Sequence, residues 1–423
     1  MSADIVVIGT GYVGITTAAC LAHLGHRVIG ADIDERRVEQ LSSGVIPIVE
    51  DGLEELVKEG LASGNLRFTT DRAGGAASCE FAYLCVPTPQ GPDGSADLSH
   101  IEDVARVIGP ALPPESIVVN KSTVPVGSTR VVERVLSRSD VFVVSNPEFL
   151  REGSAVHDFL HPDRIVIGSD DQSAAIRVAS LYLGIASPPI VTDPASAETI
   201  KYASNAFLAT KVSFVNAIAA VCEAVGADVH DVVLGMGYDP RIGHQFLRPG
   251  PGWGGSCLPK DTRALVRIAE DSGYDFDLLK GVITVNEQQL ERVVTKVSDA
   301  VGGSVDGRRI AAWGLAFKAR TDDLRDSPAL DVIRRLTARG AIVRAYDPAV
   351  HKEIEGIEVC SDPYAACEDA EVLVVLTEWD EFRWLDLDKV AASMINLAIV
   401  DSRNVLDRAG AARRGFTYQG IGR

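Results

Sequence analysis

Residues 4–32 constrain the fold more than any other part of the chain. The apolar run DIVVI (4–8) leads directly into GTGYVG (9–14), a helical pattern ITTAACLAHLG follows, and HRVIGAD (26–32) is a second strand-like run. This order predicts a βαβ unit with a glycine-rich first turn. In such a unit the unpaired backbone N–H groups at the start of the helix can bind phosphate.

The same segment carries the signature of a dinucleotide site. Gly9, Gly11 and Gly14 fit the pattern G-x-G-x-x-G, and Asp32 ends the second strand about 20 residues further on, where a ribose hydroxyl needs an acceptor. The glycines alone would fit a merely tight turn, but the strand, the helix and the acid together predict dinucleotide binding. Asp32 favours NAD over NADP because a carboxylate repels the additional phosphate, while the nearby Arg37 weakens that preference.

The rest of the chain alternates between two kinds of pattern. Strand-like runs at 81–86, 116–120 and 141–145 between helical stretches predict a parallel, doubly wound sheet in a first domain, 1–194. Residues 195–226, apolar at helical spacing, predict one long helix that opens an all-helical domain, 195–300. Strand-like runs at 309–317, 341–348, 372–377 and 398–401, with a helix at 328–339, predict a second α/β sheet in 301–423. Its first turn, WGLAFK, lacks the full glycine pattern, so it need not bind a dinucleotide.

Composition narrows the range of functions. The chain has 423 residues and a net charge of −18, which disfavours binding to nucleic acid or to an anionic membrane, and an anionic substrate would need a local basic pocket. Its seven cysteines are scattered without a C-x-x-C pair, so structural disulfides and a zinc site are not expected. With no secretory leader and no uninterrupted apolar span, we expect a cytoplasmic protein.

The loop PGWGGSCLPKD (251–261) places a lone thiol, Cys257, in front of a helical pattern. A free cysteine is most often a small buried hydrophobe. Here Pro259 suits the first helical turn, and the helix start and Lys260 both favour the thiolate. The glycines around the thiol let the backbone approach a ligand closely. The loop therefore predicts a nucleophilic cysteine.

Two further pairs stand four residues apart. Lys201 and Asn205 share one face of the long helix; they are either a solvated stripe or, within this apolar stretch, groups that stabilise a developing negative charge. Glu148 and Glu152 follow a strand, and they are either a helix-start charge pattern or a source of a proton acceptor, provided that partial burial raises the carboxyl pKa. His157 and His161 have no evident third ligand, so we expect no metal site.

These motifs resemble the UDP-glucose 6-dehydrogenases, within the nucleotide-sugar dehydrogenases that also act on GDP-mannose and UDP-N-acetylmannosamine. The likeness covers nearly the whole chain in family order, through GTGYVG, NKSTVPVGS, SNPEFLREGSAVHDFLHPDRIVIG, KYASNAFLATKVSFVNAIA, DPRIGHQFL, GGSCLPKD, WGLAFKARTDDLRDSPALD, TEWDEF and YQGIGR. It implies two Rossmann-like domains joined by a long helix and a central helical dimerisation domain. It also implies a homodimer or higher oligomer.

The resemblance implies a four-electron oxidation of carbon 6, in which NAD takes a hydride twice and UDP-glucose becomes UDP-glucuronate. Cys257 would add to the aldehyde to form a thiohemiacetal, and the second oxidation would give a thioester that water hydrolyses. Lys201 and Asn205 fall on the family's oxyanion-stabilising pair, and Asp261 with Thr123 on the pair that positions water. Glu148 falls on the base of thioester hydrolysis, while the base of the first oxidation stays open.

The resemblance also implies two sets of binding residues. The NAD set comprises Gly9, Gly11, Tyr12, Val13, Gly14, Asp32, Arg37, Val86, Pro87, Thr88, Ser122, Thr123, Glu152 and Arg325. The UDP-sugar set comprises Glu148, Phe149, Leu150, Arg151, Glu152, Lys201, Asn205, Arg241, Arg248, Gly250, Gly252, Trp253, Phe317, Lys318 and Arg403. Arg241 would reach in from a neighbouring subunit. The cations of the second set would form the basic pocket that the acidic composition requires.

Four residues depart from the family pattern: Asp51, Trp253, Leu258 and Ser402. None of them removes a reacting group, although Ser402 stands beside Arg403. A sister dehydrogenase of another nucleotide sugar is the main alternative. A non-catalytic NAD-binding protein is a further one, but such a protein would be expected to have lost Cys257 or Lys201.

Overall fold

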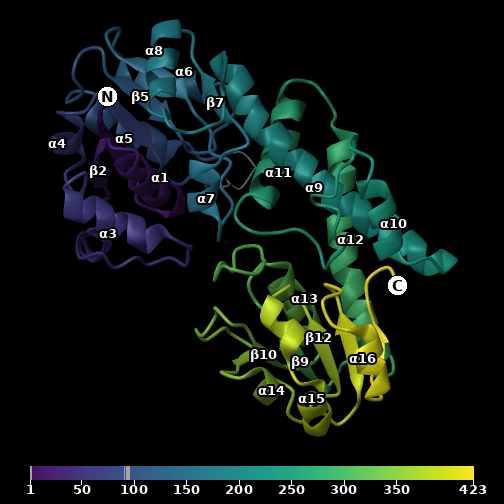
Figure 1. The fold of residues 1–423 in the computed structure, drawn as a ribbon. Helices are drawn as coiled ribbons and strands as arrows, with labels where there is room; N and C mark the ends of the chain where they lie inside the picture. Colours follow the sequence, from purple (N-terminus) through teal and green to yellow (C-terminus); the bar gives the residue numbers. More distant parts are fainter. Residues whose placement is uncertain (1, 90, 92–95) are drawn as a thin grey trace. The chain divides into compact units, whose positions relative to one another are not determined.

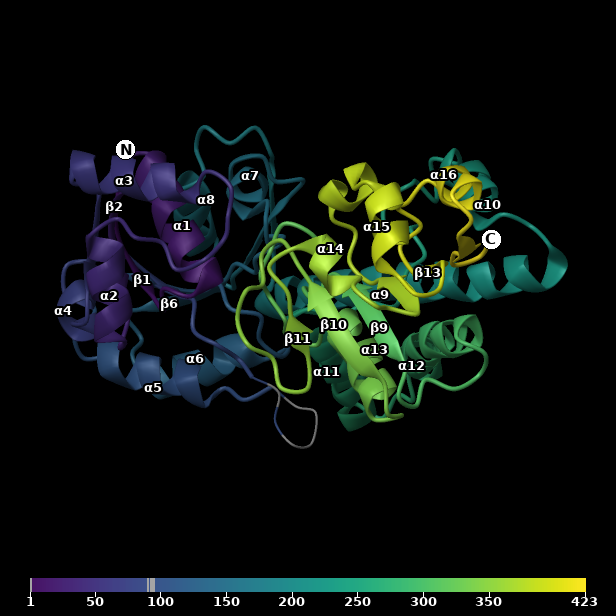
Figure 2. The ribbon, with the colours of Figure 1, turned by 90° about the horizontal axis from the view of Figure 1, so that it is seen from below.

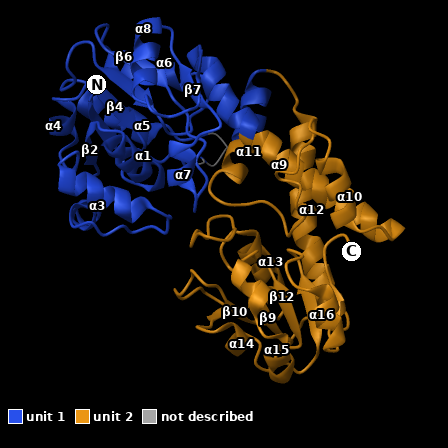
Figure 3. Ribbon diagram, viewed as in Figure 1, with its two compact units in different colours: residues 1–204, 263–272 blue, residues 205–262, 273–423 orange. Residues whose placement is uncertain are grey.

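The computed structural model describes residues 2–89, 91 and 96–423. The chain divides into two compact units (Figure 3): unit 1 comprises residues 1–204 and 263–272, and unit 2 comprises residues 205–262 and 273–423. Two helices, α9 (Pro194–Val225) and α11 (Leu258–Asp271), contribute residues to both units.

Among the described residues, unit 1 holds an eight-stranded sheet in the order β3-β2-β1-β4-β5-β6-β7-β8. The strands are β1 (Asp4–Ile8), β2 (Arg27–Ala31), β3 (Leu66–Thr69), β4 (Phe81–Leu84), β5 (Ile117–Asn120), β6 (Phe142–Ser145), β7 (Ile165–Gly168) and β8 (Pro189–Thr192). The first six follow the doubly wound order, which confirms the predicted Rossmann-like fold.

One strand pair departs from the predicted parallel sheet. β6 and β7 pair in the antiparallel direction, through the single partners Ser145 and Gly168, whereas β7 and β8 are parallel to each other. The prediction of a strictly parallel sheet is therefore wrong at this pair. Strand direction is set by how the chain between β6 and β7 returns to the sheet, and the short apolar run IVIG carries no signal for it.

Helices cover both faces of this sheet (Figures 1 and 2). They are α1 (Tyr12–His23), α2 (Glu35–Ser42), α3 (Leu53–Ser63), α4 (Arg72–Ala76), α5 (Ser99–Ile108), α6 (Ser128–Leu136), α7 (Ala155–Leu160) and α8 (Gln172–Ser180). Residues of α1, α3, α7 and α8 share one buried cluster with the sheet, and residues of α4, α5 and α6 share another. The inner strands are buried on both faces, which explains their unbroken apolar runs.

Two glycines of the first turn are required by close packing. Gly9 adopts a φ of +89°, and a Cβ there would lie 2.6 Å from the backbone oxygen of Cys85. A Cβ on Gly14 would lie 1.8 Å from the backbone oxygen of Gly9. At Gly11, by contrast, a Cβ would meet nothing within 4 Å, so this position leaves space above the start of α1.

Unit 2 combines helices with a second sheet. Its described strands form a six-stranded parallel sheet in the order β11-β10-β9-β12-β13-β14. They are β9 (Arg309–Trp313), β10 (Ile342–Tyr346), β11 (Glu358–Val359), β12 (Val372–Val375), β13 (Ala398–Asp401) and β14 (Thr417–Gln419). The predicted second Rossmann-like sheet is thus confirmed.

Helices again pack on both faces of this sheet. They are α10 (Val229–Gly237), α12 (Asp277–Ala300), α13 (Pro328–Thr337), α14 (Pro363–Ala366), α15 (Leu387–Ser393) and α16 (Arg408–Arg413), with a 3₁₀ helix η1 (Asp380–Trp384). Residues of α9, α10, α12 and α13 share one buried cluster with the sheet, and residues of α14, η1, α15 and α16 share the other. The helical segment predicted between the two sheets is confirmed, whereas the domain boundaries at 194/195 and 300/301 stay a prediction.

Of the described helices, only α9 has the length and apolar composition that a membrane span needs. A third of its most apolar window is buried inside the protein. The core helix of a soluble protein can meet the same criteria, so this feature alone is weak evidence for a span.

Candidate active site

The glycine-rich turn and Asp32 form a site that fits a dinucleotide. Asp32 is 7% exposed, and its Oδ2 accepts hydrogen bonds from the backbone N–H (2.7 Å) and the hydroxyl (2.8 Å) of Thr10. Its Oδ1 accepts from Asp34 N–H at 3.1 Å, and Arg37 lies 3.6 Å away. Burial by itself would raise the pKa of Asp32, but these donors and Arg37 hold it below its ordinary value. The carboxylate is therefore fixed and ionised, as a ribose acceptor must be.

Two predicted cofactor segments lie together at the ends of β4 and β5. The Ser122 hydroxyl donates to the backbone oxygen of Val86 at 2.7 Å, and the Thr88 hydroxyl donates to that of Thr123 at 2.7 Å. Carboxyl ends of parallel strands next to the glycine turn are where such folds bind nucleotides. These bonds, the space at Gly11 and the fixed Asp32 fit NAD.

In unit 1, two predicted catalytic residues, Lys201 and Glu148, form a buried ion pair. Lys201 Nζ donates to Glu148 Oε1 at 2.8 Å, and the two side chains are only 4% and 5% exposed. Glu148 Oε2 accepts from Leu150 N–H at 2.6 Å, and Lys201 Nζ lies 5.4 Å from the centre of the Phe149 ring. Sequence reasoning placed these residues in one site but did not foresee the direct pair.

The pair overturns the expected pKa shift of Glu148. Burial by itself would raise the carboxyl pKa, as predicted, but the charge of Lys201, its hydrogen bond, the Leu150 N–H and the charge of Lys121 outweigh burial. The pKa of Glu148 is therefore lowered. The cause lies 53 residues away in sequence, so the local pattern could not reveal it.

In unit 2, Cys257 lies directly before α11, where the helix start was predicted. Its backbone oxygen accepts from Asp261 N–H at 2.9 Å, and the Ser256 hydroxyl lies 3.5 Å from its sulfur. Cys257 is partly exposed, whereas the other six cysteines, all within the described residues, are buried. Burial raises the thiol pKa of Cys20, Cys79, Cys85 and Cys367 to about 12. Accessibility therefore singles out Cys257 as the candidate nucleophile.

Asp261 binds Asn205, another predicted catalytic residue, and Lys260. Its carboxylate is fully buried and accepts from Asn205 Nδ2 at 2.6 Å and from Lys260 Nζ at 2.6 Å. The sequence predicted that Lys260 favours the thiolate of Cys257. In the structure its ammonium also binds the carboxylate of Asp261. Asn205 and Asp261 are held as a unit, and Lys201 precedes Asn205 by one turn of α9.

In unit 2, glycine backbone packs against Arg403 and Phe317, and Arg403 also pairs with Glu378 at 3.1 Å. Arg403 donates through Nε to Leu376 O at 2.9 Å and through Nη2 to Phe317 O at 3.2 Å. A Cβ on Gly250 would lie 3.1 Å from Arg403 Nη1, and one on Gly255 would lie 2.7 Å from the Phe317 ring. The glycines thus let the loop pack directly on a guanidinium and an aromatic ring, two groups that suit a nucleotide.

Several other predicted binding residues are already engaged. Trp253 is buried and donates from Nε1 to Ser213 Oγ at 2.8 Å, while the Lys318 ammonium lies 5.5 Å from the Phe317 ring centre. Arg241, Arg325 and Arg151 form ion pairs with Asp239 (2.6 Å), Asp323 (2.7 Å) and Asp158 (2.5 Å). Arg248 is exposed. The structure leaves the ligand roles of these residues as predictions.

Three of the four departures occupy ordinary positions. The Ser402 hydroxyl points into the sheet and donates to Val375 O at 2.6 Å, so it does not compete with Arg403. Leu258 begins α11, and Asp51 is exposed next to Glu50.

The rings of His157 and His161 are 5.0 Å apart, and no cluster of metal ligands occurs within the residues that the structure describes.

Three family models match the chain, each in its own segment. They are the NAD binding domain (residues 3–186), the central domain (195–288) and the UDP binding domain (311–408) of the UDP-glucose/GDP-mannose dehydrogenase family. The chain belongs to the UDP-glucose/GDP-mannose dehydrogenase family. It is therefore an NAD-dependent oxidoreductase with a domain for a UDP-sugar, and the recognition made from its motifs is confirmed.

Individual relatives resemble the chain over nearly its whole length. A UDP-glucose 6-dehydrogenase from Rhizobium meliloti is 46% identical, with 99% of each chain covered. The structure of a UDP-glucose dehydrogenase from Pyrobaculum islandicum has a TM-score of 0.93 at 38% identity and covers 100% of this chain and 98% of that one. A UDP-D-ManNAc dehydrogenase from Pyrococcus horikoshii has a TM-score of 0.88 at 28% identity, with 99% of each chain covered.

Proposed function

We propose that this family member oxidises UDP-glucose to UDP-glucuronate through a covalent intermediate on Cys257. The observation that carries the proposal is the partly exposed thiol directly before α11, next to the Asn205–Asp261 pair in a chain whose other cysteines are buried. Higher identity to UDP-glucose dehydrogenases than to the UDP-D-ManNAc enzyme favours this substrate over that of a sister dehydrogenase.

NAD, bound by the glycine turn and Asp32, supplies the acceptor for a hydride in each of two oxidations. Between them, the Cys257 thiolate forms a C–S bond to the aldehyde carbon, and the carbonyl oxygen becomes an alkoxide that takes up a proton. Lys201 and Asn205 stabilise the negative charge on that oxygen. The thiol adduct returns the carbon to an alcohol-like state, so it can lose a second hydride to the nicotinamide cofactor and its hydroxyl proton to solvent, and become a thioester.

Hydrolysis releases the product. Asp261 and Thr123 orient a water molecule, and Glu148 accepts its proton as the water oxygen adds to the thioester carbon. The C–S bond then breaks, the sulfur leaves as the thiolate, and the carboxylate is released. Glu148 is ionised at rest because Lys201 pairs with it. When Lys201 turns to the sugar oxygen, the carboxylate becomes a stronger base.

We further propose that the chain works as a homodimer in the cytoplasm. On α9, four apolar side chains spaced by seven, seven and four residues are each at least half exposed in the single chain: Phe207, Phe214, Val221 and Val225. This spacing places them on one helix face, which a second copy would cover. Arg241, whose side chain is 87% exposed, would act in the partner's site. The six buried cysteines are free thiols, which suits a reducing compartment.

The test is the stoichiometry of NADH formation with a panel of sugar nucleotides. We expect two NADH per UDP-glucose and little activity with UDP-N-acetylmannosamine or GDP-mannose. Cys257→Ser should abolish the reaction, whereas Cys360→Ser, at a buried cysteine outside the 251–261 loop, should retain it. One NADH per sugar, or full activity of Cys257→Ser, would overturn the mechanism. Preference for another sugar nucleotide would overturn the substrate assignment, and no NADH with any would favour a non-catalytic NAD-binding protein.

A further inference from the structure

Lys121, at the end of β5, is a buried cation with neutral partners. The residue is 5% exposed, and its Nζ donates to Asn146 Oδ1 at 3.1 Å and to the Tyr182 hydroxyl at 3.3 Å. The rings of Phe159 and Tyr182 each have their centre 5.7 Å from the ammonium. Within residues 2–89, 91 and 96–423, no carboxylate oxygen lies within 4.0 Å of it. Burial of an ammonium group without an anionic partner is costly, so such a lysine needs a reason.

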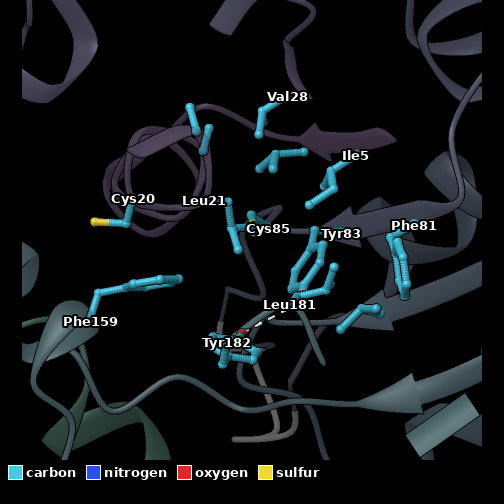
Figure 4. Close-up of a cluster of buried hydrophobic side chains, with 14 of the residues drawn as sticks. Ile5, Cys20, Leu21, Val28, Phe81, Tyr83, Cys85, Phe159, Leu181 and Tyr182 are labelled. Atoms are coloured by element: carbon cyan, nitrogen blue, oxygen red, sulfur yellow. Dashed lines mark hydrogen bonds between the residues drawn. The ribbon is translucent and has the colours of Figure 1, made fainter. Parts of the chain in front are cut away.

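The partners of Lys121 connect it to the segment that carries Glu148. Asn146 Oδ1 also accepts from the Tyr182 hydroxyl at 2.6 Å, and Asn146 Nδ2 donates to Val166 O at 2.8 Å. Asn146 precedes Glu148 by two residues. The packed surroundings of this network are shown in Figure 4, where Phe159 and Tyr182 lie in the buried cluster with Cys85. The ammonium is therefore held rigidly behind the start of the Glu148 loop.

Lys121 and Glu148 line the same cavity, which has a volume of about 140 Å³. The other ionisable groups that face it or Glu148 are Cys85, Arg151, His157, Asp158, His161, Asp163, Arg164, Tyr182 and Lys201. Arg151 pairs with Asp158, and burial keeps the Cys85 thiol neutral with a pKa of about 12. Arg164 lies over the Phe149 ring, 3.9 Å from its centre, and donates to the Ser204 hydroxyl at 3.3 Å. Besides Lys201, Lys121 is a cation whose charge acts on Glu148, and it lines the same cavity.

Lys201 has two tasks that conflict. It pairs with Glu148 in this structure, and the proposed mechanism needs it at the sugar oxygen. If Lys201 leaves, a fully buried carboxylate without another cation would take up a proton and stop acting as a base. A second ammonium that cannot turn away would prevent this.

We propose that Lys121 is a positioning residue that keeps Glu148 anionic while Lys201 serves the substrate. This inference rests on the proposed function. Lys121 acts through its charge and through Asn146, without touching the sugar. It sets the pH range in which the thioester is hydrolysed.

The experiment follows single-turnover thioester hydrolysis against pH in the full-length enzyme with UDP-glucose and NAD. In Lys121→Met the acid limb of the hydrolysis rate should move up by about one pH unit or more, and the thioester should accumulate at acid pH. Lys121→Arg keeps the charge and should restore most of the wild-type profile. Lys389→Met is the matched control, since that exposed lysine also lies over a ring, that of Tyr364, at 5.4 Å.

A profile of folded Lys121→Met that matches the wild-type profile would overturn the inference while leaving the proposed function intact. If Lys121→Met does not fold, Lys121→Gln gives the same readout, because its amide can still donate to Asn146 without carrying charge. An unshifted limb in that variant would equally overturn the inference. Wild-type enzyme that forms no thioester from UDP-glucose would instead overturn the proposed function.

Discussion

At the scale of single residues, the site depends on buried carboxylates whose charges are held by specific donors. Asp32 is the clearest case, because Thr10, Asp34 and Arg37 all stabilise its ionised form. Since the pKa of Asp32 is lowered, its charge is lost only when the pH falls below the ordinary range of an aspartate. NAD binding should therefore be independent of the Asp32 titration at neutral pH.

Replacing Asp32 with serine should weaken NAD selectively. A hydrogen bond to a charged group contributes about 1.5–3 kcal/mol, so the KM for NAD should rise by roughly ten-fold to a hundred-fold, and discrimination against NADP should fall. Initial rates with each cofactor measure both effects. Asp71→Ser is the control, because Asp71 only caps α4 in the same unit. An unchanged KM for NAD would remove Asp32 from the cofactor site.

Some residue roles could be predicted from the sequence and others could not. Cys257 and Asp32 stand at predictable places, because a helix start and a strand end are local patterns. The roles of Glu148 and Lys121 depend on distant partners: Lys201 is 53 residues from Glu148, and Asn146 and Tyr182 are 25 and 61 residues from Lys121. Lys121 lies in the motif NKSTVPVGS, directly after an apolar strand. This position at a strand end was the one local sign that the lysine belongs to the site.

At the scale of elements, Glu198 of the long helix α9 supports the start of α6, which follows the predicted NAD-binding residues Ser122 and Thr123. This side chain is 2% exposed and accepts hydrogen bonds from Gly127 N–H (2.6 Å), Thr129 N–H (2.9 Å) and the Thr129 hydroxyl (2.8 Å). These groups lie at the start of α6, which follows the Ser122–Thr123 segment. Glu198 thus caps α6 from a helix that also carries Lys201, and the sequence did not reveal this contact.

Replacing Glu198 with alanine should loosen α6. Leaving buried donors unsatisfied costs about 1–3 kcal/mol, so the amides of α6 should exchange with deuterium roughly ten-fold faster in hydrogen-exchange mass spectrometry. Glu133→Ala changes a partly exposed glutamate of the same helix that pairs with Arg130 and should have little effect. Equal exchange in Glu198→Ala and wild type would show that the cap does not stabilise α6.

Strands that are apolar along their whole length could be predicted from the local sequence. The predicted runs at 4–8, 116–120 and 372–377 appear as β1, β5 (Ile117–Asn120) and β12 (Val372–Val375) because these strands are buried on both faces. The antiparallel β6–β7 pair could not be predicted, since strand direction depends on the path of the intervening chain.

At the scale of the whole molecule, the proposed dimer makes each active site depend on two chains. Arg241→Ala and Cys257→Ser should each be nearly inactive as homodimers. In an exchanged mixture, a hybrid dimer has one site that lacks both substitutions, so activity should return to about a quarter of the wild-type value. Native mass spectrometry measures hybrid formation. Hybrids that form without recovered activity would contradict the role of Arg241 across the interface.

The apolar face of α9 offers a separate test of assembly. Phe214→Asp places a charge on this face and should shift the chain toward monomers in analytical ultracentrifugation, because a buried unpaired charge opposes association. Leu278→Asp, at another exposed apolar residue of unit 2, is the matched control. A dimer that is unaffected by Phe214→Asp would place the interface elsewhere.

The most direct test of the central claim is mass spectrometry of the Cys257 peptide from enzyme quenched during turnover. Glu148→Gln removes the proposed base of hydrolysis, so with UDP-glucose and NAD this variant should accumulate a uridine diphosphate-sugar adduct on Cys257. The account predicts that adduct together with two NADH per bound sugar. An unmodified Cys257 in enzyme that continues to form UDP-glucuronate would contradict it.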